Sequence, residues 1–122
     1  MSRTGKTIVI IDDDASVRRA LRRLVRSAGL NVETFGSADE FLLSTEQQVP
    51  GCLILDVHLP GLSGLELQQR LKAEGCCVPI VFITAYGDDQ MCERALRAGA
   101  LAFLHKPFED QALLDAVDRA VG

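Results

Sequence analysis

The stretch CLILDVHLPGLSG, residues 52–64, decides the fold of this chain. Its first four residues are apolar and predict a short strand that is buried on both faces. The strand ends in a carboxylate, Asp56, and the proline, glycines and serine that follow are loop signals. Ser63 and Glu66 have the spacing of a capping box, which predicts that a helix begins there. Asp56 is therefore expected at the carboxyl end of a central strand, where open α/β sheets bind their ligands.

Working outward from this stretch, apolar β-branched runs alternate with segments of helical periodicity. Strands are predicted over residues 7–11, 30–35, 52–55, 80–84 and 101–104, the second of them an edge strand because polar residues interrupt it. The first helix is predicted to end at about residue 28, and the second is predicted to begin at residue 37. The third and fourth are predicted to span residues 64–75 and about 89–98, and the fifth to begin at residue 107. Five strands therefore alternate with five helices.

This alternation predicts an α/β fold, a doubly wound five-stranded parallel sheet of the flavodoxin-like type. Right-handed crossovers and the common strand order 2-1-3-4-5 place the switch point between the first and third strands. Asp12 and Asp13 follow the first strand and Asp56 ends the third, so these carboxylates are expected to face one another. At 122 residues, the chain 1–122 is expected to form a single domain.

The composition excludes several classes of protein. No apolar run approaches the roughly 20 residues of a membrane span, and the first residues lack a signal-peptide pattern. A net charge of −4 argues against direct binding of nucleic acid by this domain. Cys76 and Cys77 could form a redox pair, but the cysteines show no metal-ligand spacing and reduced thiols are the simpler interpretation. We therefore expect no membrane association and a cytoplasmic protein.

The expected convergence of carboxylates has a chemical consequence. Asp12, Asp13 and Asp56 would repel one another. An all-oxygen ligand set of this kind favours a hard divalent cation, Mg²⁺ or Mn²⁺. Thr84 ends the fourth strand and offers a hydroxyl, and Lys106 follows the fifth and offers an ammonium group. A carboxylate nucleophile beside a metal, a hydroxyl and a lysine is typical of a phosphoryl acceptor that forms an aspartyl phosphate.

These residues resemble the receiver domain of two-component response regulators over essentially the whole chain. Residues 84–88 and 106–110 are most similar to the FixJ-type branch. The matching residues are Ile11-Asp12-Asp13-Asp14, Asp56 with Leu59-Pro60 and Gly64, Thr84-Ala85, and Phe103 with Lys106-Pro107-Phe108.

The resemblance implies a role for each residue at the acidic edge. Asp56 matches the phosphorylated aspartate, and Asp13 matches a direct metal ligand. Asp12 would act mainly through water or by orienting the site. His58 stands where the backbone carbonyl is the third protein ligand of the metal, so its imidazole need not touch the ion.

The resemblance also implies a switch. Thr84 matches the hydroxyl that moves to bind the phosphoryl group, and Phe103 matches the aromatic residue whose rotamer reports activation. Lys106 matches the phosphate partner and is expected to form a cis peptide bond with Pro107. Phe103 could alternatively be only a core aromatic residue.

The implied function is a phosphorelay signal-transduction receiver. It would take a phosphoryl group from a cognate histidine kinase or phosphotransfer protein and change conformation to control an output such as transcription. Phosphorylation is expected to produce a homodimer through the face of the fourth helix, fifth strand and fifth helix. Candidate apolar contacts on that face are Met91, Ala95, Leu101 and Leu113.

Two other functions would use part of this pattern. A magnesium-dependent phosphatase uses the same acyl-phosphate chemistry but usually needs an acidic residue two positions after the nucleophile, where this chain has His58. A purely structural adaptor would not need the complete acidic site. We therefore expect no enzyme, but a phosphoacceptor switch. The default interpretation of the row Arg18, Arg19, Arg22, Arg23 and Arg26 is a solvated polar face. The resemblance suggests instead that the first helix docks the kinase, with Arg19, Arg22, Arg23 and Arg26 flanking an apolar contact.

Overall fold

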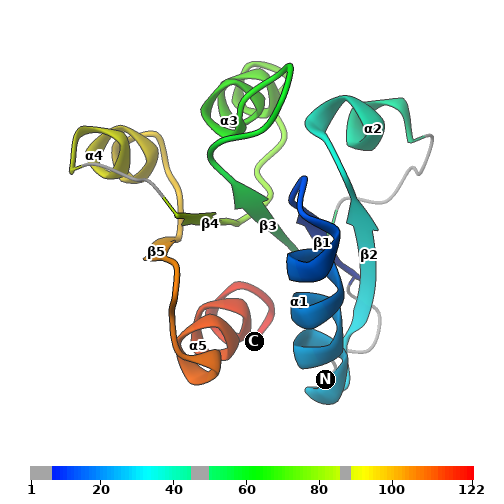
Figure 1. Cartoon of the computed structure of the whole chain (residues 1–122). Coiled ribbons are helices and arrows are strands. Elements are labelled where there is room, and N and C mark those ends of the chain that lie inside the picture. Colours follow the sequence, from blue (N-terminus) through cyan, green and yellow to red (C-terminus); the bar gives the residue numbers. More distant parts are fainter. Residues whose placement is uncertain (1–6, 45–49, 86–88) are drawn as a thin grey trace.

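Five parallel strands form one twisted sheet at the centre of the molecule (Figure 1). The computed structural model describes residues 7–44, 50–85 and 89–122. The strand order is β2-β1-β3-β4-β5, which confirms the predicted topology and the edge position of the second strand. The strands are β1 (Thr7–Ile11), β2 (Asn31–Phe35), β3 (Cys52–Asp56), β4 (Ile80–Thr84) and β5 (Ala102–His105).

Helices cover both faces of the sheet, as a doubly wound fold requires. Figure 1 shows α2, α3 and α4 on one face and α1 and α5 on the other. Within the described residues, no helix combines the length and the apolar character needed to span a bilayer. The helices are α1 (Ala15–Ser27), α2 (Ala38–Leu43), α3 (Gly64–Ala73), α4 (Asp89–Arg97) and α5 (Asp110–Val121).

The sheet divides the hydrophobic core into two clusters because successive strand side chains point to opposite faces. Val9, Leu53 and Phe82 belong to the cluster under α2, α3 and α4. Ile8 and Ile54 belong to the cluster under α1 and α5. All residues of β3 and β4 are buried, so each cluster anchors the strands that end at the acidic edge.

The last predicted elements shift along the chain. The fifth strand occupies residues 102–105 instead of 101–104, and α5 begins at Asp110 instead of Pro107. Phe108 packs against the core cluster of α1 and α5, and Glu109 has extended dihedral angles as the N-cap. The loop is therefore fixed by packing before the helix starts. The Lys106–Pro107 peptide bond is cis, as predicted.

Two of the four predicted apolar dimer contacts are wrong. Ala95 and Leu113 have no exposed surface, because each points from its helix into a core cluster. Met91 and Leu101 are half-buried. Leu96, by contrast, is a large apolar residue of α4 that is 44% exposed.

Candidate functional site

Three carboxylates meet at the carboxyl ends of the neighbouring strands β1 and β3. One oxygen from each of Asp12, Asp13 and Asp56 lies within 4.8 Å of the others. Asp12 and Asp56 are buried, whereas Asp13 is exposed. An all-carboxylate oxygen set of this kind suits Mg²⁺ or Mn²⁺, with the remaining positions left for water. The imidazole of His58 is not part of this group, and its side chain is exposed.

Lys106 reaches across this cluster from the end of β5. Its Nζ lies 3.0 Å from Oδ2 of Asp12 and 3.3 Å from Oδ2 of Asp56. Burial would lower the pKa of Lys106, but the hydrogen bond to Asp12 and the charges of both carboxylates raise it overall. Lys106 is therefore a fully charged cation that holds two carboxylates together.

The two carboxylate oxygens of Asp56 have different hydrogen-bond partners. Oδ1 accepts a hydrogen bond of 2.9 Å from the backbone N–H of His58, while Oδ2 faces Lys106. The pKa of Asp56 is raised, first because the group is buried and then because Asp12 is close. These effects outweigh the His58 N–H and Lys106, which lower it. A bound divalent cation would favour the charged carboxylate of a nucleophile.

Asp12 is oriented by the first turn of α1. Its Oδ1 accepts a hydrogen bond of 2.9 Å from the backbone N–H of Asp14, and its backbone carbonyl accepts one of 2.6 Å from Nη1 of Arg18. Asp14 in turn caps α1 by accepting from the N–H of Ser16 at 2.8 Å. The sequence placed Arg18 only in the arginine row. Its position one helical turn after the capping residue Asp14 was the available signal for this contact.

Gly64 places the start of α3 directly against the backbone of the acceptor strand. Its N–H donates to the carbonyl of Val57 at 3.0 Å. A Cβ at this position would lie 2.4 Å from the carbonyl oxygen of Asp56 and 3.0 Å from Cα of Val57. Since only glycine can approach this closely, Gly64 fixes the loop that carries His58. The predicted capping box is present, with Ser63 and Glu66 each accepting from the backbone N–H of the other.

The two predicted switch residues lie near this edge but differ in exposure. Thr84 ends β4 and is fully buried. Phe103 is half-buried, with its ring centroid 6.0 Å from that of Phe82 and 5.3 Å from that of His105. The roles of both residues stay predictions. Positions 86–88 of the FixJ-like signature lie outside the described residues.

The chain matches a known protein family. Residues 8–118 match the family described as response regulator receiver domain. The chain belongs to this family. The α/β sheet, the carboxylates at the ends of β1 and β3 and the lysine after β5 are therefore parts of a receiver domain.

The chain is similar to curated proteins, several of which are named as response or transcriptional regulators. It is 53% identical over 114 residues to Nodulation protein W of Bradyrhizobium diazoefficiens, with 93% of this chain and 50% of that protein covered. It is 47% identical over 121 residues to the response regulator TodT of Pseudomonas putida, covering 99% of this chain and 53% of that protein. The chain therefore spans about half the length of these curated relatives.

Solved structures have the same fold. The response regulator StyR superposes with a TM-score of 0.87 at 53% identity, over 95% of this chain and 59% of that one. Full-length FixJ from B. japonicum superposes with a TM-score of 0.88 at 41% identity, over 97% of this chain and 58% of that one. The predicted similarity to FixJ is thus confirmed.

Proposed function

We propose that this receiver domain accepts a phosphoryl group on Asp56 from a cognate histidine kinase or phosphotransfer protein, in a Mg²⁺-dependent reaction. The phosphorylated domain then changes conformation and controls an output, which we take to be transcription. The observation that carries this proposal is the convergence of Asp12, Asp13, Asp56 and Lys106 at one sheet edge. We treat residues 1–122 as one domain, and its cytoplasmic location stays a prediction.

The chemistry follows from the groups at this edge. An oxygen of Asp56 attacks phosphorus, the bond from phosphorus to the donor imidazole nitrogen breaks, and that nitrogen keeps the electron pair. The ammonium group of Lys106 lies at hydrogen-bond distance from Asp56 and can neutralise an oxygen of the arriving group. Thr84 would supply a hydroxyl to the same group. Since only Asp56 itself is modified, the domain acts as a switch and not as an enzyme with a separate substrate.

The carboxylates fit a divalent cation by their donor chemistry. Asp12, Asp13 and Asp56, with the backbone carbonyl of His58, would hold Mg²⁺ or Mn²⁺. The ion would neutralise charge on the transferred phosphoryl oxygens. Lys106 offsets part of the repulsion between Asp12 and Asp56.

Intact mass spectrometry tests this function. The purified domain incubated with acetyl phosphate and Mg²⁺ is expected to gain the mass of one phosphoryl group, which alkaline hydroxylamine should remove as it does from acyl phosphates. The same incubation with EDTA is expected to give no gain. An unchanged mass in the presence of Mg²⁺ would contradict the proposal.

Metal binding can be measured separately from phosphorylation. At a Mg²⁺ concentration of roughly 100 times Kd, mass action is expected to stabilise the wild-type domain by about 2.7 kcal/mol and to raise its Tm. Asp13→Asn is expected to lose most of this rise, because one of three carboxylate ligands is gone. Asp115→Asn, which changes an exposed aspartate on α5, is the matched control and should respond like the wild type. Equal shifts for the Asp13 variant and the wild type would exclude Asp13 as a ligand.

The output is expected to be dimerisation. We propose that phosphorylation draws Thr84 toward the phosphoryl group and Phe103 inward, which alters the face of α4, β5 and α5 and pairs it with a second copy. Light scattering should find a monomer without phosphorylation and a dimer with beryllofluoride and Mg²⁺. Thr84→Ala should still gain the phosphoryl group but remain monomeric, whereas Thr34→Ala on β2 should dimerise. A wild-type monomer in both states would mean that the output uses another partner.

The arginine row of α1 supports a kinase as the phosphoryl donor. Arg19, Arg22, Arg23 and Arg26 are exposed, because the apolar side of the helix, with Leu21 and Val25, packs into the core. The row forms a positively charged surface on a domain whose net charge is −4, and such a surface is complementary to an acidic partner protein. Docking of the donor along α1 remains part of the proposed function.

A further inference from the structure

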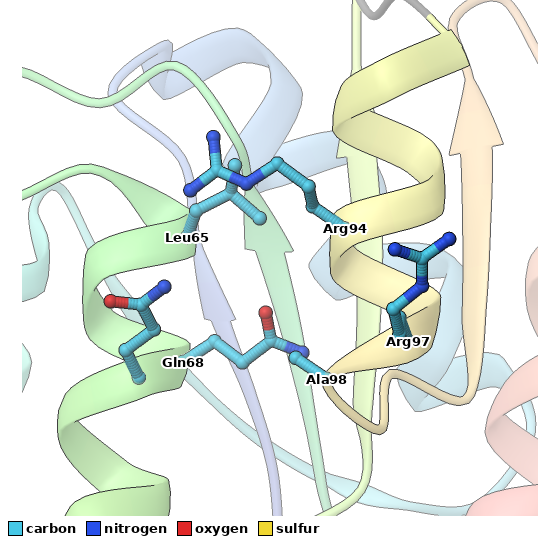
Figure 2. A pocket seen from close by; sticks show the side chains of 6 residues that line it. Leu65, Gln68, Arg94, Arg97 and Ala98 are labelled. Atoms are coloured by element: carbon cyan, nitrogen blue, oxygen red, sulfur yellow. The ribbon is translucent and has the colours of Figure 1, made fainter.

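A second hollow lies between α3 and α4, away from the carboxylates. It encloses about 210 Å³. Figure 2 shows it between the two helices, with Arg94 reaching from α4 over Leu65 of α3. None of the residues that line it belongs to the site around Asp56. These residues are Leu65, Gln68, Gln69, Arg94, Arg97 and Ala98.

The positive charges of this groove have no acidic partner in the described part of the chain. Arg94 and Arg97 are exposed, and neither has an ion-pair partner among residues 7–44, 50–85 and 89–122. Nε of Arg70 on α3, by contrast, lies 3.6 Å from Oε2 of Glu74. Two unpaired guanidinium groups at one groove are suited to a carboxylate, which they can bind by charge-assisted hydrogen bonds.

Gln68 adds an independent feature, since its side chain is buried and polar. The residue is only 4% exposed, and its Nε2 donates to the backbone carbonyl of Ala95 at 3.0 Å. Figure 2 shows this side chain extending from α3 toward α4 with its amide oxygen turned into the groove. That oxygen accepts no hydrogen bond from the described part of the chain. Because this acceptor faces the groove, the groove is suited to a ligand that brings an N–H group.

The size of the groove restricts the ligand further. Small-molecule sites usually enclose about 300–1,000 Å³, and this hollow is smaller. It has room for one side chain with its adjoining backbone. Leu65 and Ala98 supply an apolar surface for methylene groups, while the arginines supply the charge.

We propose that the α3–α4 groove binds an aspartate or glutamate side chain presented by a partner protein. The carboxylate lies against Arg94 and Arg97, and a backbone N–H of the partner donates to Oε1 of Gln68. This inference does not depend on phosphorylation of Asp56, so it can fail or hold separately from the proposed function.

The test uses the smallest peptide-like probe, N-acetyl-glutamate N-methylamide, titrated into the ¹⁵N-labelled full chain. Saturable amide shifts are expected at Leu65, Gln68 and Ala98, with a Kd on the order of millimolar because a single side chain is bound. N-acetyl-glutamine N-methylamide, which lacks the charge, and butyrate, which keeps one carboxylate but lacks both amides, should each bind at least about fivefold more weakly. Binding of the glutamine probe at equal strength would overturn the charge argument. Equal binding of butyrate would overturn the peptide ligand in favour of a free carboxylate.

Variants locate the binding. Arg94→Gln and Arg97→Gln should each weaken the glutamate probe about fivefold or more, and both positions are exposed, so folding should be retained. Arg70→Gln, outside the groove on α3, is the matched control and should bind like the wild type. The absence of saturable shifts in the wild type, or unchanged affinity in the Arg94→Gln/Arg97→Gln double variant, would refute the proposal.

Discussion

Asp56→Asn is expected to abolish the gain of a phosphoryl group from acetyl phosphate in the presence of Mg²⁺. Asparagine has nearly the same shape, so the hydrogen bond from the His58 N–H to the side-chain oxygen can persist. The amide is uncharged and is not a competent nucleophile for phosphorus. The loss should therefore be chemical, without unfolding of the site.

Intact mass after a fixed incubation measures this effect. Asp115→Asn is the control, because it makes the same substitution at an exposed residue whose carboxylate, among the described residues, accepts a side-chain hydrogen bond only from Gln111, at 2.8 Å. This control should gain one phosphoryl group at the wild-type rate. A mass gain by the Asp56 variant would move the acceptor to another residue, and peptide mapping would then identify it.

Gly64→Ala is expected to destabilise the domain by about 2–3 kcal/mol, the range for a side chain forced into a packed site. In a helix this substitution is usually favourable by up to about 1 kcal/mol. Here the new Cβ would lie 2.4 Å from the carbonyl oxygen of Asp56, and both nearest neighbours are backbone atoms that cannot rotate away. The clash should therefore outweigh the helix preference for alanine and make the substitution destabilising.

Urea unfolding compares this variant with Gly36→Ala. At Gly36 a Cβ would lie 3.3 Å from Nη1 of Arg18, and this side chain, although it donates to the Asp12 carbonyl, needs to shift by only a few tenths of an ångström. The control should therefore change stability much less. If both variants unfolded at the same urea concentration, the close approach of α3 to the strand end would not constrain the site.

The predicted fold came from strong local signals. Continuous apolar runs ending in aspartate identified β1 and β3, and their adjacency followed from the common topology of a sheet this size. These signals are enough to predict that Asp12, Asp13 and Asp56 converge. The capping residue Ser63 located the start of α3 for the same reason: its signal lies within four residues of sequence.

Contacts between distant elements could not be predicted in this way. The bonds from Arg18 to the Asp12 carbonyl and from Gln68 to Ala95 depend on how helices pack. The inward orientation of Ala95 and Leu113 has the same origin, because a small or apolar residue on a short helix suits either a core or an interface. The start of α5 was misplaced because Pro107 is typical of a first helical turn, whereas here it belongs to the preceding loop.

The position of the strands in the sheet implies that the parts of the site differ in local stability. The strands β1 and β3 are paired on both sides, while β5 is an edge strand of four residues, none of which is fully buried. Free energies of local opening follow such differences, so amide hydrogen exchange should be faster in β5 than in β3. Each opening of β5 would release Lys106 while the three carboxylates stay in place. The lifetime of an acyl phosphate on Asp56 would then depend on how often this edge strand opens.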